Sequence, residues 1–254
     1  MSIDRIEITY TPHHKTLTEA GNSHFHRVVD ALAEFVDNSI QASDNEKQRH
    51  VHVSFFLNNL DGFLTISDNG VGMTSDTIKQ FATYALDRET RSMQSTGRAG
   101  IGRFGVGAKQ AGFYLGNRIR VITKCKDNEK VMEFSLDSEV LQQRFVDNQE
   151  LYRDLIMVRN KDDHSLVPAD ERAITAMQTA LTVHEKDHDN FTIFVIKMRR
   201  NRVQQMLLHD RYRDIANELA EIYHYHLHPE HLPDNISSIP KFKDAGGRYL
   251  LEIS

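Results

Sequence analysis

The sequence predicts a fold of the α/β class, in which strands and amphipathic helices share a core. Several segments alternate apolar and polar side chains, as half-buried strands do, and others repeat apolar residues with helical spacing. The chain has 254 residues, of which 39% are hydrophobic and 26% charged, enough for one large domain with a sizeable core. The single cysteine excludes a disulfide framework within the chain and suits a reducing compartment.

Charge and hydropathy exclude several classes of partner. The formal net charge is -5, so the chain has no global basic footprint for nucleic acid or an anionic membrane. The N-terminus lacks an apolar signal core, and no run of residues approaches the length of a membrane span. We therefore expect an intracellular protein without a membrane partner.

The first part of the chain predicts alternating element types. In chain order, the expected elements are a strand at 3–10, a helix at 24–42, strands at 51–57 and 63–67, and a helix at 75–86. Residues 87–103 are polar and glycine-bearing and show no periodicity. Loops of this length are usually functional or disordered, so we expect a long loop here.

The second part predicts a larger sheet and a helical end. The expected elements are a helix from near Gly105 to Leu115, strands at 118–124 and 130–136, a helix at 168–182, a strand at 191–198, a helix at 203–227 and a strand at 247–253. We divide the chain into a main domain, residues 1–200, and a C-terminal extension with a helix and a short strand, residues 201–254.

The expected helix at 24–42 carries the first segment with recognisable chemistry. Glu34 and Asn38 lie one turn apart, so their side chains are neighbours. A carboxylate can polarise a water for attack on a phosphate, and an amide oxygen can ligate Mg²⁺. Taken alone, this segment is better explained by an ordinary solvated helix face.

A second segment, SDNGVGM, follows an expected strand directly. Asp68 stands at the strand end, where its carboxylate can accept a hydrogen bond from the exocyclic amine of adenine. Gly70 and Gly72 permit close approach of a ligand or a positive φ, and Met73 can pack its thioether on a ring. A simple glycine turn between strand and helix is the competing explanation.

A third segment, residues 97–112, is rich in glycine and ends in a helix. Such a segment can present backbone N–H groups to phosphate, and Lys109 can add a charge. The spacing of Gly100, Gly102 and Gly105 matches a dinucleotide fingerprint, but the residues before it are polar rather than a buried strand. A P-loop also fails, because no Ser or Thr follows Lys109.

Two further features carry weaker signals. Thr192 lies in an apolar strand, where it can bind adenine or a bridging water, although threonine is common in strands. Two local basic clusters could contact nucleic acid, but a solvated edge is the commoner explanation. These clusters are Lys197, Arg199, Arg200 and Arg202, and Arg118, Arg120, Lys124 and Lys126.

Together and in this order, the segments resemble the GHKL ATPase family, named for gyrase, heat-shock chaperone, histidine kinase and MutL. The N-box of the family is similar to Glu34, Asp37 and Asn38 with Ala42 at its end. The first glycine box resembles Asp68, Gly70 and Gly72, and the glycine box after the lid resembles Gly102, Gly105 and Gly107. Within the family, ALAEFVDNSIQA, RFGVGAKQAGFYLG and ELAEIYHYHLH are similar to the chromatin-associated structural-maintenance-of-chromosomes hinge-domain and MORC branches.

The resemblance implies a role for each matching residue. Glu34 would be the general base, Asn38 the Mg²⁺ ligand, and Asp68 the acceptor for the adenine amine, with residues 87–103 as the ATP lid. The implied nucleotide-binding residues are Asn38, Asp68, Gly70, Gly72, Met73, Gly102, Gly105, Val106, Gly107, Lys109 and Thr192.

The resemblance also implies the Bergerat fold, a two-layer α/β sandwich whose mixed, largely antiparallel sheet is covered on one face by helices. The implied function is Mg²⁺-dependent ATP hydrolysis, with lid closure and homodimerisation on ATP binding, in the nucleus and in chromatin organisation or gene silencing. Two alternatives remain: an ATP-binding dimerisation switch that does not hydrolyse, and a histidine kinase catalytic domain. The kinase would need a phosphoacceptor hairpin for which few residues precede the first helix.

Overall fold

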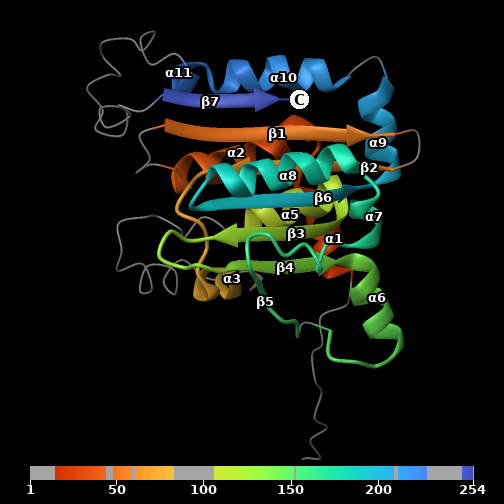
Figure 1. Ribbon diagram of the computed structural model, residues 1–254. Coiled ribbons are helices and arrows are strands. Elements are labelled where there is room, and N and C mark those ends of the chain that lie inside the picture. The colour runs from red at the N-terminus through yellow and green to blue at the C-terminus, as the bar shows by residue number, and fades with distance from the viewer. Residues whose placement is uncertain are drawn as a thin grey trace, which may run out of the picture.

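The structure of the chain, a computed structural model, describes residues 15–43, 48–58, 61–82, 106–151, 153–208, 211–227 and 248–253. A seven-stranded sheet crosses the molecule in the order β5-β4-β3-β6-β2-β1-β7 (Figure 1). Its strands are β1 (Gln48–Leu57), β2 (Gly62–Asp68), β3 (Gly116–Lys124), β4 (Val131–Asp137), β5 (Met157–Arg159), β6 (Phe191–Met198) and β7 (Arg248–Ile253). Neighbouring strands are antiparallel except β1 and β7, which are parallel. The mixed, largely antiparallel sheet is thus confirmed.

One face of the sheet carries the larger core. The helices on this side are α1 (Thr16–His24), α2 (Val28–Ala42), α3 (Ser75–Ala82) and α5 (Val106–Leu115). Phe194 of the central strand β6 lies at the middle of this core, with its ring centroid 4.9 Å from that of Phe35 on α2 and 5.9 Å from that of Phe81 on α3. All three side chains are at most 1% exposed, so α2 and α3 are fixed on the sheet by aromatic packing.

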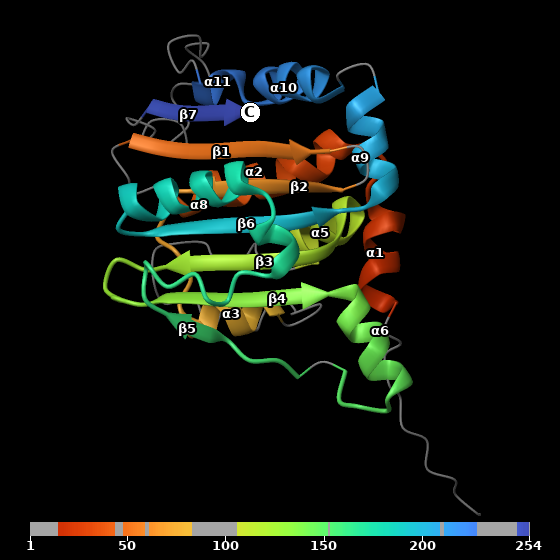
Figure 2. The same cartoon turned by 45° about the vertical axis from the view of Figure 1, so that its right-hand side comes forward.

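The opposite face is also partly covered by helices, which corrects the expectation that helices cover one face alone. The helices α7 (Ala169–Arg172) and α8 (Thr175–Asp187) lie across it (Figure 2). Met177 and Leu181 of α8 belong to a second cluster with Ile193 and Val195 of β6. Successive side chains of a strand point to opposite faces, so burial on both sides explains the unbroken apolar run of β6.

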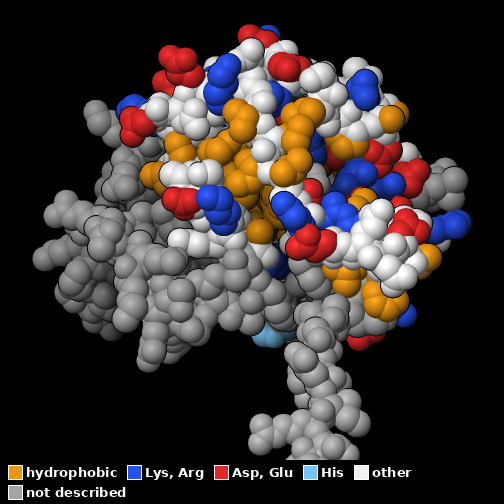
Figure 3. Space-filling model, turned by 90° about the horizontal axis from the view of Figure 1, so that it is seen from below, with side chains coloured by type: hydrophobic (Ala, Val, Ile, Leu, Met, Phe, Trp, Pro, Cys, Tyr) orange, Lys and Arg blue, Asp and Glu red, His pale blue; other side chains and the backbone are white. Residues whose placement is uncertain are grey.

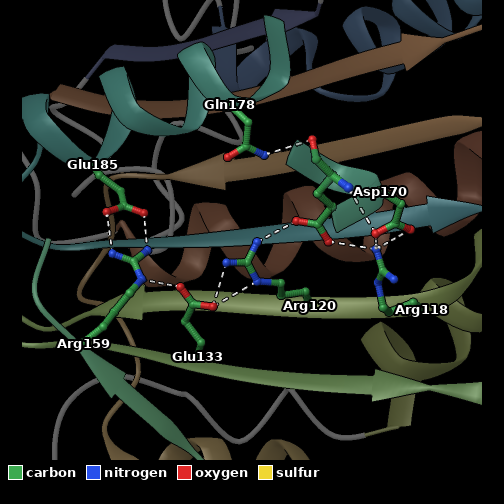
Figure 4. Close-up of polar contacts among 8 residues, drawn as sticks. Arg118, Arg120, Glu133, Arg159, Asp170, Gln178 and Glu185 are labelled. Atoms are coloured by element: carbon green, nitrogen blue, oxygen red, sulfur yellow. Dashed lines mark hydrogen bonds and ion pairs between the residues drawn. The ribbon is translucent and has the colours of Figure 1, made fainter. Parts of the chain in front are cut away.

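Charged side chains fasten this second layer to the sheet. Arg120 of β3 donates to Glu133 of β4 at 2.7 and 3.0 Å and to Glu171 of α7 at 2.6 Å (Figure 4). Arg159 of β5 binds Glu133 as well and holds Glu185 of α8 through two hydrogen bonds of 2.5 and 3.0 Å. All five residues are at most 4% exposed. Such buried pairs are costly to break because they leave an uncompensated charge.

Most members of the two basic clusters make contacts within the fold, whereas Lys126 and Arg200 are exposed, as a solvated edge requires. Arg120 is buried in the network, and Arg118 binds Asp170 at 2.9 Å. Lys197 pairs with the same Asp170 at 3.0 Å, and the Lys124 ammonium donates to the Asp189 carbonyl. These side chains serve the attachment of α7 and the loop before β6 rather than a nucleic-acid surface.

Three expected helices differ from those in the structure. The helix expected at 24–42 begins only at Val28, as α2, because Phe25 and Arg27 are extended, with ψ values of 140° and 143°. The helix expected at 168–182 is α7 and α8, and that at 203–227 is α9 (Arg200–Leu207), α10 (Arg211–Ile222) and α11 (His224–Leu227). Apolar spacing continues across these breaks, so periodicity alone could not locate them.

Three elements were not expected: the helices α1 and α6 (Ser138–Val146) and the edge strand β5. Asp137 caps α6 by accepting from the backbone N–H of Glu139. Hydrophobic side chains gather on the underside of the molecule (Figure 3). The large exposed ones on α6, β5 and their connection are Val140, Phe145, Val146, Leu155, Met157 and Val158.

Candidate functional site

Helix α2 presents the predicted general base to the beginning of α5. Glu34 is half-buried, and a Cβ atom added at Gly107 would clash with its Oε2 and lie 3.1 Å from its Cδ. Gly107 belongs to the first turn of α5, whose N-terminal N–H groups and dipole favour anions. The absence of a side chain at Gly107 therefore lets the carboxylate lie against this turn.

Asn38, one turn further along α2, is 3% exposed. The interpretation of this segment as an ordinary solvated helix face is therefore wrong at Asn38. Its Nδ2 is buried and has no hydrogen-bond partner among the described residues. A buried amide without its full set of protein partners is costly. Its chemistry fits a site in which a ligand completes the hydrogen bonds or the amide oxygen ligates Mg²⁺.

Asp68 is buried where α2, β2 and β6 meet. Its side chain is 1% exposed and accepts a hydrogen bond of 2.9 Å from the N–H of Gly70. Ser39 on α2 and the backbone of Thr192 on β6 lie close to the carboxyl group, although the Ser39 oxygen has no hydrogen-bond partner among the described residues. Burial raises the pKa of Asp68 from 3.8 to about 7, while the Gly70 N–H and these two neighbours oppose the rise. The carboxyl group thus lies where three elements meet.

The loop after β2 is held against the end of α2. The Val71 N–H donates to the Ala42 carbonyl at 3.0 Å, and a Cβ atom at Gly70 would lie 2.8 Å from three atoms of Ala42. Gly72 has a φ of +72°, and a Cβ atom there would clash with the Lys124 carbonyl. Both glycines are therefore required by the packing of the loop itself.

Thr123 of β3 joins the residues expected to surround the base. Its hydroxyl accepts from the Met73 N–H at 2.8 Å, donates to the Phe191 carbonyl at 2.9 Å and lies 3.3 Å from the Thr192 hydroxyl. Thr192 stands directly opposite Asp68 on the neighbouring strand. The structure therefore brings Met73, Thr192 and Asp68 together, and Met73 is 1% exposed within the larger core.

Two side chains of the second layer support the same loop from behind. The Asn190 amide donates to the carbonyl groups of Asn69 at 3.0 Å and Gly70 at 2.6 Å. His184 of α8 places its Nε2 3.1 Å from the Asp68 carbonyl oxygen. Burial, followed by the neighbouring His188, lowers the pKa of His184 to about 3, so its imidazole is neutral near pH 7.

Lys109 lies apart from this group in its present contacts. The side chain is 1% exposed, and its ammonium donates to the Phe81 carbonyl, in the last turn of α3. The ammonium is also 5.1 Å from the centroid of the Phe81 ring. A cation at the C-terminal end of a helix is stabilised by the helix dipole, so Lys109 has a structural contact besides its predicted phosphate contact.

The family of the chain follows from this geometry together with its sequence. Residues 26–161 match the model of the histidine kinase-, DNA gyrase B- and HSP90-like ATPase family. The chain belongs to this family. The match begins just before α2 and ends after β5, so it contains Glu34, Asn38, Asp68 and Gly107 but not Thr192.

Curated relatives of this ATPase family match beyond these boundaries. The chain is 28% identical over 246 residues to the human structural maintenance of chromosomes flexible hinge domain-containing protein 1, and 29% over 247 residues to that of Mus musculus. Each match covers 87% of the chain but 12% of the relative, so the chain spans about an eighth of their length. It is 32% identical over 104 residues to the ATPase morc-1 of Caenorhabditis elegans, covering 41% of the chain and 11% of that protein.

Some predicted residues of the ATPase site cannot be placed. Gly102, Gly105 and the expected lid, residues 87–103, lie outside the described residues, as does the strand expected at 3–10. Val106 is the first residue of α5. Within the described parts, no helix is both long and apolar enough to cross a membrane.

Sequence reasoning missed the side chains that hold the predicted ones. Ser39 lies inside the predicted segment, and its place next to Asn38 was its only signal. Thr123 and Asn190 lie in other parts of the sequence, and nothing local distinguishes them from an ordinary strand or loop residue. Their roles depend on pairing of β3 with β6, which brings residues 116–124 beside residues 191–198.

Proposed function

We propose that the chain binds ATP together with Mg²⁺ and hydrolyses the terminal phosphate. One observation supports this most strongly: a single helix, α2, contacts both ends of the site. Its Glu34 lies against the first turn of α5, and its Ser39 lies beside Asp68. These residues are five positions apart, about 7–8 Å along a helix axis at its usual rise. A nucleotide whose phosphates lie near α5 and whose base lies near Asp68 would extend along α2.

Each residue then has one task in the reaction. Asp68 accepts a hydrogen bond from the exocyclic amine of adenine, and the N–H groups at the beginning of α5 bind phosphate oxygens. Glu34 polarises a water toward the terminal phosphate and takes its proton. Asn38 would hold Mg²⁺ through its amide oxygen. When bound, the ion neutralises charge on the phosphate oxygens.

A binding switch without hydrolysis is the second candidate. It is favoured by Lys109, because the ammonium expected at the phosphates is bound to the Phe81 carbonyl. In both candidates, ATP closes the lid at residues 87–103 and drives homodimerisation. Analytical ultracentrifugation with a non-hydrolysable ATP analogue tests dimerisation: the sedimenting mass should double, and an unchanged mass would count against it.

We also propose a nuclear role in chromatin organisation or gene silencing, supported by the relatives named for chromosome maintenance. Direct nucleic-acid binding has less support, because two arginines of the basic clusters, Arg118 and Arg120, are paired with carboxylates. If duplex DNA does bind, its affinity should fall steeply with salt. A fluorescence anisotropy titration at two salt concentrations measures this.

Calorimetric titration with ATP, with and without Mg²⁺, combined with a phosphate-release assay, tests the proposal. Glu34→Gln should keep ATP affinity within about threefold and lower turnover by at least about 100-fold, because a general base contributes about 10²–10⁴. Asp30→Asn, on an exposed position of the same helix, is the matched control. Retained binding with no turnover in the unmodified chain would favour the switch, and absence of ATP binding would refute both candidates.

A further inference from the structure

The C-terminal helices touch α2 at the turn that carries the proposed catalytic residues. Tyr223 stands between α10 and α11 and is 3% exposed. Its hydroxyl lies 3.0 Å from the Ala33 carbonyl oxygen and 2.9 Å from Asp37 Oδ1. Ala33 immediately precedes Glu34, and Asp37 immediately precedes Asn38. One hydroxyl group from a segment 186 residues away therefore binds both sides of this turn.

The local charges keep this hydroxyl group a donor. Burial first, and then the charge of Asp37, raises the pKa of Tyr223 far above its ordinary value, and the charge of Glu34 adds to the effect. The phenol is therefore protonated near pH 7 and can donate its hydrogen.

A second contact ties the same helix pair to the beginning of α2. Glu218 of α10 forms an ion pair with Arg27, the residue at the N-cap of α2. Glu218 is also 3.9 Å from Arg211 at the start of α10. The helix α10 is thus attached to α2 at its N-cap through Glu218, and Tyr223 adds the attachment at Ala33 and Asp37.

We propose that Tyr223 is a positioning residue, which fixes the turn of α2 that carries Glu34 and Asn38 and so couples docking of α10 and α11 to ATP turnover. This inference rests on the proposed hydrolysis. Tyr223 does not contact the reacting atoms in this assignment; it sets the orientation of the side chains that do. Displacement of the C-terminal helices by a partner or by the remainder of a longer chain would lower turnover without occupying the nucleotide site.

The substitution Tyr223→Phe isolates the hydroxyl group, because the ring keeps its packing and Asp37 is exposed to water. The expected result is a kcat at least about fivefold lower with KM for ATP changed less than about twofold. Hydrogen–deuterium exchange of amides 33–42 should be at least about threefold faster, with an unchanged urea midpoint. Tyr212→Phe, a half-buried tyrosine in the first turn of α10, is the matched control and should change none of these quantities.

Asp37 supplies a rescue test. Asp37→Asn retains an oxygen that accepts from Tyr223 and should keep kcat within about twofold, whereas Asp37→Ala should lower it as Tyr223→Phe does. The double variant Tyr223→Phe with Asp37→Ala should have a kcat little lower than that of either single variant, because the two residues act through one contact. A kcat and an exchange rate in Tyr223→Phe equal to those of the unmodified chain would overturn the assignment. Absence of turnover in the unmodified chain would refute hydrolysis, and the exchange rates would still decide whether Tyr223 fixes α2.

Discussion

Replacement of Asp68 by asparagine should make the folded chain more stable at pH 8 while weakening ATP binding. The pKa of Asp68 is raised from 3.8 to about 7, so the folded protein holds a proton that the unfolded chain releases. The contribution of Asp68 to stability is therefore largest below about pH 4 and is lost as the pH rises through 7. At 1.36 kcal/mol per pKa unit, the complete loss is about 4 kcal/mol.

The asparagine side chain does not titrate. The difference in the free energy of unfolding between Asp68→Asn and the unmodified chain must therefore depend on pH. Relative to the unmodified chain, Asp68→Asn should gain about 3 kcal/mol between pH 5 and pH 8. Its amide oxygen can keep the Gly70 N–H, but its NH₂ group needs an acceptor, which costs about 1–3 kcal/mol at every pH. The pH-dependent part of the difference is therefore the informative quantity.

Urea unfolding at pH 5, 6, 7 and 8, followed by circular dichroism because the chain has no tryptophan, measures this difference. The control is the same substitution at an exposed position, Asp127→Asn. A constant difference between Asp68→Asn and the unmodified chain would refute the reasoning about buried charge. Calorimetry should also show ATP affinity reduced about 10- to 100-fold, since a hydrogen bond to a charged group contributes about 1.5–3 kcal/mol.

Three further substitutions test parts of the fold and site. Gly72→Ala should cost about 1–3 kcal/mol of stability, because φ is +72° and the added Cβ meets backbone; a urea midpoint unchanged from the unmodified chain would contradict this. Glu133→Gln should cost about 3–5 kcal/mol by leaving Arg120 and Arg159 without their shared carboxylate. In thermal unfolding it should be far less stable than the exposed control Glu129→Gln. Asn190→Ala should cost about 1–3 kcal/mol of stability and weaken ATP binding, because two carbonyl groups lose their donor. An ATP affinity equal to that of the unmodified chain, measured by calorimetry, would contradict a role of this loop in binding the base.

The site residues that sequence reasoning found share one property: their chemistry is legible within a short segment. Asp68, Gly70 and Gly72 stand together at a strand end. Two reasons for a glycine at position 72 followed from the sequence, close approach of a ligand or a positive φ, and Gly72 does have a positive φ. Glu34 and Asn38 follow helical spacing. Motif order then identified the family, which residues 26–161 confirm.

The supporting residues could not be found in the same way, because their partners are distant in the sequence. Tyr223 and Asp37 are 186 residues apart, and Arg120 and Glu171 are 51 apart. An arginine inside a strand predicts a solvent-facing position. Arg120 is buried instead, because α7 and α8 cover the second face of the sheet. The break between α1 and α2 is equally hidden, because Phe25 is buried although its backbone is extended.

Hydrogen–deuterium exchange with and without ATP and Mg²⁺ tests most directly whether a nucleotide lies along α2. Exchange should slow in three separate segments, residues 34–42, 66–73 and 106–112, while residues 175–187 of α8 on the opposite face keep their rates. Protection in all three segments at ATP concentrations near the calorimetric Kd is the predicted result. Protection restricted to one of them, or found on α8 instead, would contradict a nucleotide held between Asp68 and the first turn of α5.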